Sequence, residues 1–357
     1  MEKIVKLVRL IADGRHNAFP SIIRFKGDLY LTYRTSDGHA CCNGVIVLMR
    51  SKDDGETWEK IASPYEGGRN WYEGFLAELN GRLFMYAGSF AADKPVLTQL
   101  NSQYVSYSDD GEKWSIPQQA IGGHKRFWRP RNINGRLYAG AYCLLTREHV
   151  DEAGVFPPED FEGDLAVSDD GLHWEIVSAL SRNESGNETE IFYDEEENLL
   201  HAYIRRENCP GTLAIRKAAY PFTQWSDTVD FGEALQGVCV KKCHGRLFMF
   251  GRRRESSTNM GTIYYDRNKI SFRGYVCIPE LGRWFDYVTM PGSQDCSYPE
   301  ILELPDDRML IAYYSQHAYE GSDINSAADI YLATVRCDGE PDVNLKVAGM
   351  LRKKGII

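Results

Sequence analysis

The sequence has no long apolar run and no regular spacing of cysteines. Charged residues at positions 2, 3, 6 and 9 interrupt the N-terminal segment, so it lacks the apolar stretch of a signal peptide, and no other stretch reaches membrane-spanning length. The nine cysteines are odd in number and scattered, without the spacing of a disulfide or zinc framework. We therefore expect a cytoplasmic protein with reduced cysteines and no contact with a membrane.

Acidic residues outnumber basic residues in the sequence. The chain has 41 Lys and Arg against 51 Asp and Glu, which gives a formal net charge of −10. This balance argues against nucleic-acid binding, which needs a basic face, although a local arginine cluster could still hold a small anion. The sequence also contains no phosphate-binding loop, nucleophile elbow or metal-ligand motif, so we expect no cofactor and no metal.

Helical periodicity is nearly absent, and a six-fold repeat of β-type segments takes its place. Each copy holds an alternating run led by Gly, Asn or Asp, a preceding apolar run and a third run that follows. The leading runs are GDLYLTYR, GRLFMYAG, GRLYAGAY, NLLHAYIR, GRLFMFGR and DRMLIAYY, and the third runs are VIVLMRS, QYVSYS, DLAVS, LAIRKA, TIYYD and IYLATVR. Six such units predict an all-β fold, a six-bladed β-propeller that forms a single domain over residues 1–357.

Three copies continue into a further motif after the third run. SKDDGETW at 51–58 matches the pattern S-x-D-x-G-x-x-W in full, whereas YSDDGEKW at 107–114 and VSDDGLHW at 167–174 have Tyr107 and Val167 in place of the leading Ser. These segments resemble the Asp-box (BNR repeat) of sialidase-like propellers. An Asp and a Gly make a tight turn while the Trp anchors it, so we expect a structural role at the rim of the blade.

The ring must also close without a bare strand edge. The run KIVKLVRLI near the N-terminus can complete the last blade beside IYLATVR, and the run NLKVAGML near the C-terminus competes for the same place. The sequence leaves both arrangements open.

In a propeller the first strand of each blade lines the central axis, and residues at its start and at the end of the second strand build a central pocket. The repeat places many charged and aromatic residues there. They are Asn17, Phe19, Arg34, Asp37, His39, Trp71, Tyr72, Glu73, Trp128, Arg129, Arg131, Glu188, Glu190, Arg205, Arg206, Arg252 to Arg254, Asp295, Tyr298 and Glu300.

The resemblance to sialidases implies roles for some of these residues. Sialidases use a tyrosine nucleophile with a glutamate partner, an aspartate acid/base and three arginines that hold a carboxylate. The run DCSYPEILELPDDRMLIAYY is similar to the tyrosine strand and ETEIFYDEEENLLHAYIRR to the glutamate strand, which implies a nucleophile at Tyr298 and its partner at Glu190. Asp37 is the nearest candidate for the acid/base. The candidate substrate-binding residues are Arg34, Arg205, Arg252, Arg253, Arg131, Trp128, Glu300 and His39.

Structural alternatives accompany several of these roles. Trp128 can stack on a sugar or pack in the core, and His39 can be an ordinary hydrogen-bonded residue. Strand alternation lets at most two of Arg252 to Arg254 share a face. The first blade departs from the sialidase pattern, since Ala18 stands where the F-R-I-P motif has its arginine, and Arg15 or Arg34 would have to substitute.

These features predict a sialidase-like glycoside hydrolase that acts on a terminal, acidic sugar through Tyr298, Glu190 and an arginine cluster. The partner is therefore a carbohydrate. One alternative is a polysaccharide lyase or another glycosidase on the same scaffold, and another is a propeller that binds carbohydrate without turnover.

Overall fold

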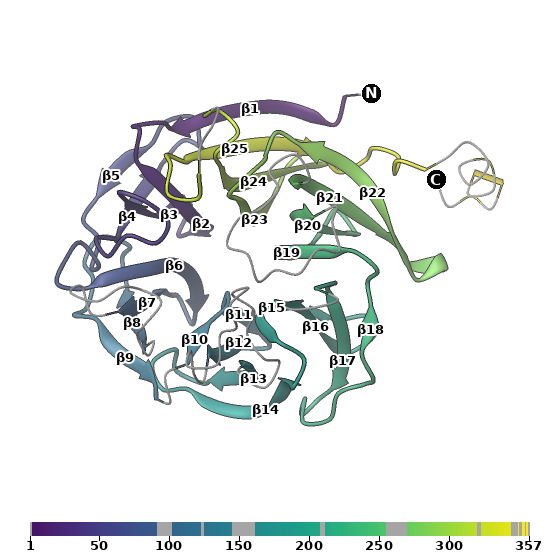
Figure 1. The fold of residues 1–357 in the computed structure, drawn as a ribbon, viewed down its shortest axis with the longest axis horizontal. Helices are drawn as coiled ribbons and strands as arrows, with labels where there is room; N and C mark the ends of the chain where they lie inside the picture. Colours follow the sequence, from purple (N-terminus) through teal and green to yellow (C-terminus); the bar gives the residue numbers. More distant parts are fainter. Residues whose placement is uncertain are drawn as a thin grey trace.

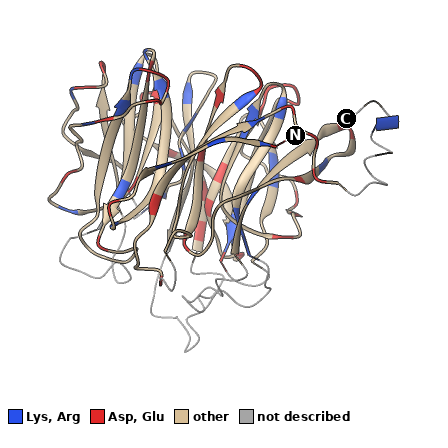
Figure 2. Cartoon of the chain, turned by 90° about the horizontal axis from the view of Figure 1, so that it is seen from above, with Lys and Arg blue, Asp and Glu red and all other residues tan. Residues whose placement is uncertain are grey.

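Six antiparallel sheets lie in a ring around a central axis in the computed structural model (Figure 1). The structure describes residues 2–90, 102–122, 125–144, 161–207, 211–254, 270–319, 323–343, 349, 352–353 and 355. The predicted six-bladed β-propeller is confirmed. Figure 2 shows that charged residues lie on the strands of the ring as well as on its loops.

Each sheet is one blade, and in blades one to five the first strand in the chain lies nearest the axis, whereas in blade six β23 is innermost and β1 is outermost (Figure 1). Blade one consists of β2 (His16–Phe25), β3 (Asp28–Ser36), β4 (Val45–Ser51) and β5 (Glu59–Ile61). Blade two consists of β6 (Asn70–Leu79), β7 (Arg82–Phe90), β8 (Ser102–Ser108) and β9 (Gln118–Ile121). Blade three consists of β10 (Arg126–Phe127) and β11 (Arg131–Ile133), which both pair with β12 (Arg136–Leu144), then β13 (Phe161–Ser168) and β14 (Glu175–Arg182).

The other three blades follow the same order. Blade four consists of β15 (Gly186–Asp194), β16 (Leu199–Arg206), β17 (Ala214–Ala219) and β18 (Val229–Asp230). Blade five consists of β19 (Ala234–Cys243), β20 (Arg246–Arg254), β21 (Ile270–Ile278) and β22 (Arg283–Met290), and a 3₁₀ turn at Pro279–Leu281 precedes β22. Blade six consists of β23 (Cys296–Leu304), β24 (Arg308–Ser315), β25 (Asp329–Arg336) and β1 (Ile4–Ile11).

Tight turns explain the first hairpin of five blades. Two consecutive residues with positive φ join the first and second strands, as at Asn80–Gly81 (φ 54° and 76°) and Asn134–Gly135 (φ 52° and 80°). This pair of left-handed residues is the two-residue turn whose twist matches that of the strands it joins. The Gly-led runs of the sequence repeat therefore mark the turns that precede the second strands of blades one, two, three and five.

The ring closes through its N-terminal strand, as one of the two sequence alternatives predicted. β1 pairs antiparallel with β25, and Val8 lies opposite Leu332 while Ile11 lies opposite Ile330. The competing run at 344–351 lies outside the described residues apart from Gly349.

One strand assignment was wrong. The run TIYYD at 262–266 was predicted to be the third strand of blade five, but it lies outside the described residues, and β21 pairs with β20 and β22 in that place. The error arose because both segments have the same β-type composition. Among the described residues, no helix is long and apolar enough to cross a membrane.

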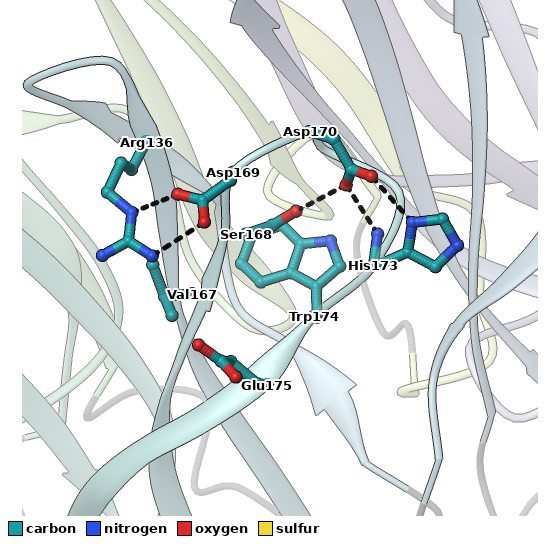
Figure 3. A pocket seen from close by; sticks show the side chains of 8 residues that line it. All are labelled: Arg136, Val167, Ser168, Asp169, Asp170, His173, Trp174 and Glu175. Carbon is teal, nitrogen blue, oxygen red and sulfur yellow. Dashed lines mark hydrogen bonds and ion pairs between the residues drawn. The ribbon is translucent and has the colours of Figure 1, made fainter.

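The three Ser-Asp-Gly-Trp turns follow the third strands of blades one, two and three. In blade three the Oγ atom of Ser168 donates to Asp170 Oδ1 at 3.1 Å (Figure 3). It also accepts from the backbone N–H of Gly171 at 2.9 Å. Ser108 makes the same two bonds in blade two. The prediction that Tyr107 and Val167 replace the leading Ser was therefore wrong. Ser108 and Ser168, which follow them, make the hydrogen bonds of the leading Ser in a turn that is one residue shorter.

Candidate active site at the centre of the ring

Backbone bulges distort the innermost strands at the centre of the ring. The pairing of first and second strands shifts in register between Ala18 and Ser21, and equivalent shifts occur in blades two, four, five and six. Phe19 (φ 56°), Glu73 (φ 41°) and Tyr298 (φ 49°) adopt left-handed conformations at these bulges. Such a conformation costs a residue with a side chain about 1–3 kcal/mol, and this strain tends to gather at functional sites.

Blade five has a glycine at the corresponding bulge. Gly237 also has positive φ (56°), and a Cβ atom on it would lie 2.8 Å from Cδ2 of Tyr298. The Tyr298 ring therefore lies directly against this backbone and is held further by Phe19 and Trp128, whose ring centroids lie 5.0 and 5.1 Å away. The tyrosine is rigidly placed.

The hydroxyl of Tyr298 lies within a buried triangle of polar groups. It donates a hydrogen bond to Glu188 Oε1 at 2.8 Å and accepts one from Arg205 Nη1 at 2.9 Å. Arg205 Nη1 also contacts Glu188 Oε2 at 2.6 Å. Burial and the nearby Glu188 carboxylate raise the pKa of Tyr298 well above its usual value, so the resting phenol is neutral.

The predicted pairing of Tyr298 with Glu190 was wrong. Glu190 Oε1 accepts from Arg131 Nη2 at 2.6 Å, and its Oε2 accepts from Trp128 Nε1 at 3.0 Å. Arg131 Nη1 in turn donates to Glu300 at 2.7 Å. Glu190, Arg131 and Glu300 thus form an ion network in the interior, and the carboxylate that meets the tyrosine comes two residues earlier on β15.

Trp128 lies beneath the tyrosine instead of lining an open face. Only 1% of its surface is exposed, and its ring contacts Phe75 at 5.4 Å between centroids in addition to Tyr298. The structure therefore places Trp128 in the core, as its structural alternative proposed.

Asp295 anchors a second buried cluster beside Tyr298. Its Oδ2 atom contacts His39 Nδ1 at 2.7 Å and His16 Nε2 at 3.1 Å. Its Oδ1 atom accepts from Tyr314 Oη at 2.7 Å and from Arg252 Nη1 at 3.1 Å. Burial alone would raise the pKa of Asp295, but the attraction to His39 and the hydrogen bonds from both histidines outweigh it and lower that pKa well below its usual value.

The adjacent arginines of β20 point to different places. Arg252 is buried and binds Asp295 and Gln236, whereas Arg253 lies 3.2 Å from Glu233 and keeps 27% of its side chain exposed. Strand alternation produces this division. Arg252 therefore belongs to the central cluster, and Arg253 was wrongly included among the residues expected there.

Two further predicted residues do not offer their charge to the centre. The guanidinium of Arg34 is fully buried, stacks over Tyr72 at 4.1 Å and donates to the carbonyl oxygens of Trp71 and Cys41. These contacts hold its guanidinium between blades one and two, so it does not take the place of the arginine missing at Ala18. The carboxylate of Asp37 is 64% exposed, and its contacts are with Arg15 at 3.2 Å and Asn43 at 2.6 Å.

Sequence reasoning missed His16 and Arg126. Arg126 forms an ion pair with Glu73; burial alone would lower the pKa of this arginine, but the pairing with Glu73 outweighs burial and raises it. It lies on the short β10 strand, just before residues 128–130, which separate β10 from β11, so the uniform repeat pattern did not place it. His16 directly precedes Asn17, which was predicted to face the centre, and that adjacency was the available signal.

Two groups of side chains among the described residues could hold a metal ion. One is His16, His39 and Asp295, and the other is Asp194, Glu197 and His201 on blade four. Within the first group, Asp295 already has four hydrogen-bonding partners, so its carboxylate is satisfied by protein groups. The expected absence of a metal stays a prediction.

A surface hollow lies at the rim, away from these clusters. Arg136, Val167, Ser168, Asp169, Asp170, His173, Trp174 and Glu175 line it (Figure 3). Its polar groups mostly satisfy the Ser-Asp-Gly-Trp turn, because Asp170 accepts from Ser168 and His173 while Asp169 pairs with Arg136. The hollow is therefore part of the blade architecture.

No known family model and no curated protein matches the sequence, but solved structures match its fold. A protein of unknown function from Dyadobacter fermentans aligns with a TM-score of 0.73 at 18% identity, over 94% of this chain and 98% of that chain. Trypanosoma rangeli sialidase in complex with sialic acid aligns with a TM-score of 0.60 at 13% identity, over 99% of this chain and 59% of that chain. Phage phi92 endosialidase aligns with a TM-score of 0.63 at 10% identity, over 95% and 70%.

The chain therefore spans well under two thirds of the length of the Trypanosoma enzyme. At such identities the likeness concerns the fold alone. In fold, the chain is a sialidase-like six-bladed β-propeller.

Proposed function

We propose that this propeller is a glycoside hydrolase that cleaves a terminal sugar with retention of configuration, using Tyr298 as nucleophile and Glu188 as its base. The observation that supports this proposal is the buried contact of the Tyr298 hydroxyl with both Glu188 and Arg205. The sialidase structures among its neighbours make a carbohydrate the natural ligand class.

The geometry suits a nucleophile that is activated only during the reaction. Because the pKa of Tyr298 is raised by burial and by Glu188, the phenol stays protonated at rest. Glu188 takes the proton as the oxygen attacks the anomeric carbon, and Arg205 stabilises the negative charge that develops on that oxygen. The contacts with Phe19, Trp128 and Gly237 keep the ring from turning away.

The charge of the sugar is a separate question. Arg205 and Arg252 both act electrostatically on Tyr298, and they are the groups available to attract the carboxylate of an acidic sugar. Each is already paired with an acid of the protein, Arg205 with Glu188 and Arg252 with Asp295. The acidic substrate thus stays a prediction, and a carboxylate would have to share these two arginines.

The test is an activity panel of aryl glycosides that includes a sialoside, glucuronides and neutral sugars. We expect release from one class of substrate, and Tyr298→Phe and Glu188→Gln should each lower kcat/KM by at least about 10³-fold. Tyr193→Phe, near the end of β15, is the matched control and should retain activity, since among the described residues its hydroxyl bonds only to Asn198 of the same hairpin.

The panel also separates the alternatives. Cleavage of neutral glycosides alone would contradict the acidic substrate but keep the tyrosine mechanism. An unsaturated uronate product would show a lyase. Binding of glycosides without turnover by the wild-type protein would replace the enzyme proposal by a carbohydrate-binding propeller.

A further inference from the structure

The proposed hydrolysis needs an acid for the leaving group, and Asp37 is badly placed for that task. Its carboxylate is mostly exposed and engaged by Arg15 and Asn43. A general acid has to lie beside the reacting bond, so another group at the centre must act.

His39 lies two residues after Asp37, but its side chain packs toward the centre of the propeller. Its ring lies edge-on to Phe19, with the centroids 5.5 Å apart, and Phe19 also contacts the Tyr298 ring at 5.0 Å. The main-chain oxygen of His39 accepts a hydrogen bond from Tyr72 Oη at 2.7 Å, which fixes the loop at this point. His39 therefore lies close to Tyr298 at the centre of the propeller, and the Phe19 side chain contacts both of them.

The contact with Asp295 defines which nitrogen of His39 can do chemistry. Asp295 is ionised and can only accept, so its Oδ2 atom holds the proton of His39 on Nδ1, at 2.7 Å. The Nε2 atom is then left for a ligand, and among the described residues nothing hydrogen-bonds to it. His16 binds the same Oδ2 atom but is fully buried, whereas 28% of the His39 side chain is exposed.

The remaining contacts of Asp295 make it a fixed support. Tyr314 and Arg252 hold its Oδ1 atom, and the two histidines hold Oδ2. A carboxylate that orients an imidazole and stabilises its protonated form is the arrangement by which many enzymes prepare a histidine for acid–base work.

We propose that His39, oriented by Asp295, is the general acid and base of the hydrolysis; this inference rests on the proposed function. In the first step the Tyr298 oxygen bonds to the anomeric carbon and gives its proton to Glu188, while protonated His39 Nε2 gives its proton to the departing glycosidic oxygen. In the second step neutral His39 takes a proton from water as the water oxygen attacks the anomeric carbon. The bond to Tyr298 breaks, and the tyrosine regains its proton from Glu188.

The experiment compares leaving groups on the sugar that the wild-type protein cleaves. A dinitrophenyl group departs without protonation, whereas an alkyl or methoxyphenyl group needs an acid. We expect His39→Asn to lower kcat/KM by about 10²-fold or more for the poor leaving groups, and by only a few-fold for dinitrophenyl. The Asn amide can still donate to Asp295, so this variant should fold, and His39→Ala provides a second variant.

Asp37→Asn is the matched control and should behave as wild type with every leaving group. Tyr298→Phe should lose activity with all of them, because the nucleophile is needed in each case. An equal loss in His39→Asn with good and poor leaving groups would overturn the role of His39 while leaving the tyrosine mechanism intact. Absence of turnover by the wild-type protein would instead overturn the proposed function, and this inference with it.

Discussion

The side chains around Tyr298 are charged although they are buried, and each charge is balanced by a nearby partner. Arg205 faces Glu188, Arg252 faces Asp295 and Arg126 faces Glu73. Removal of one partner from such a buried pair leaves an uncompensated charge and is usually strongly destabilising. Activity assays of these arginines should therefore be accompanied by a measurement of stability.

The burial of His16 makes the stability of the protein depend on pH. Burial lowers the pKa of His16 below its usual value of 6.5, even though the hydrogen bond to Asp295 acts in the opposite direction. Between the folded and unfolded pKa values the unfolded chain binds the proton more readily, so the contribution of His16 to stability is present above about pH 6.5 and lost as the pH falls.

We expect the stability difference between wild type and His16→Gln to shrink from pH 7.5 to pH 5.5, by at most about 1.4 kcal/mol per pH unit. Denaturant unfolding at several pH values measures this difference. A difference that stays constant with pH would show that His16 titrates in the folded protein as it does in the unfolded chain. Asp295 does not disturb the comparison, because its pKa is lowered and its stabilising effect is lost only as the pH falls through the ordinary carboxyl range and below it, under pH 5.5.

The resemblance to sialidases implied that Glu190 of β15 is the partner of Tyr298, but the carboxylate that contacts the tyrosine belongs to Glu188. The register of β15 and β16 shifts between Gly186 and Thr189, so side chains on either side of the shift are aimed differently. A bulge depends on the packing of neighbouring blades, which a period-2 pattern does not contain. Glu188 and Glu190 looked equivalent in sequence for this reason.

At the scale of the element, the Ser-Asp-Gly-Trp turns fix the outer half of three blades. Asp170 Oδ1 accepts the backbone N–H groups of Leu172 and His173 in addition to the Ser168 hydroxyl. The hydrogen bond between the His173 ring and Asp170 Oδ2, together with these bonds, overcomes the effect of burial and lowers the pKa of Asp170 to about 2. The Trp174 ring then packs on Phe127, with the centroids 4.4 Å apart, and ties the turn to the blade.

Neighbouring aspartates of this turn provide a direct test (Figure 3). Asp170→Ala removes the acceptor of two backbone N–H groups and should lower the free energy of unfolding by about 1–2 kcal/mol. Asp169→Ala removes only an exposed ion pair with Arg136 and should change it by less than about 0.5 kcal/mol. Thermal or denaturant unfolding of the two variants measures these changes. Equal losses of unfolding free energy in both variants would contradict the structural role of Asp170.

At the scale of the whole molecule, the sixfold repeat was sufficient to predict the architecture. The two-residue turns and the alternating runs are local features, and each recurs in enough blades to be recognised. Ring closure depends on a contact between distant parts of the chain, so the sequence offered two candidates without a way to choose. The pairing of β1 with β25 supplies the fourth strand of blade six and covers the edge of β25.

This closure should be needed for stability, because a bare β25 would expose unpaired backbone groups beside buried side chains such as Ile330 and Val335. Deletion of residues 2–11 also removes Arg9, whose guanidinium lies 2.6 Å from the fully buried carboxylate of Asp329. We expect the shortened chain to unfold at a clearly lower temperature and to self-associate through the open edge, as measured by thermal unfolding and light scattering. Leu7→Lys, on the exposed face of β1, is the control and should do neither, since the strand pairing stays in place. Unchanged unfolding of the shortened chain would mean that the ring does not depend on β1 for closure.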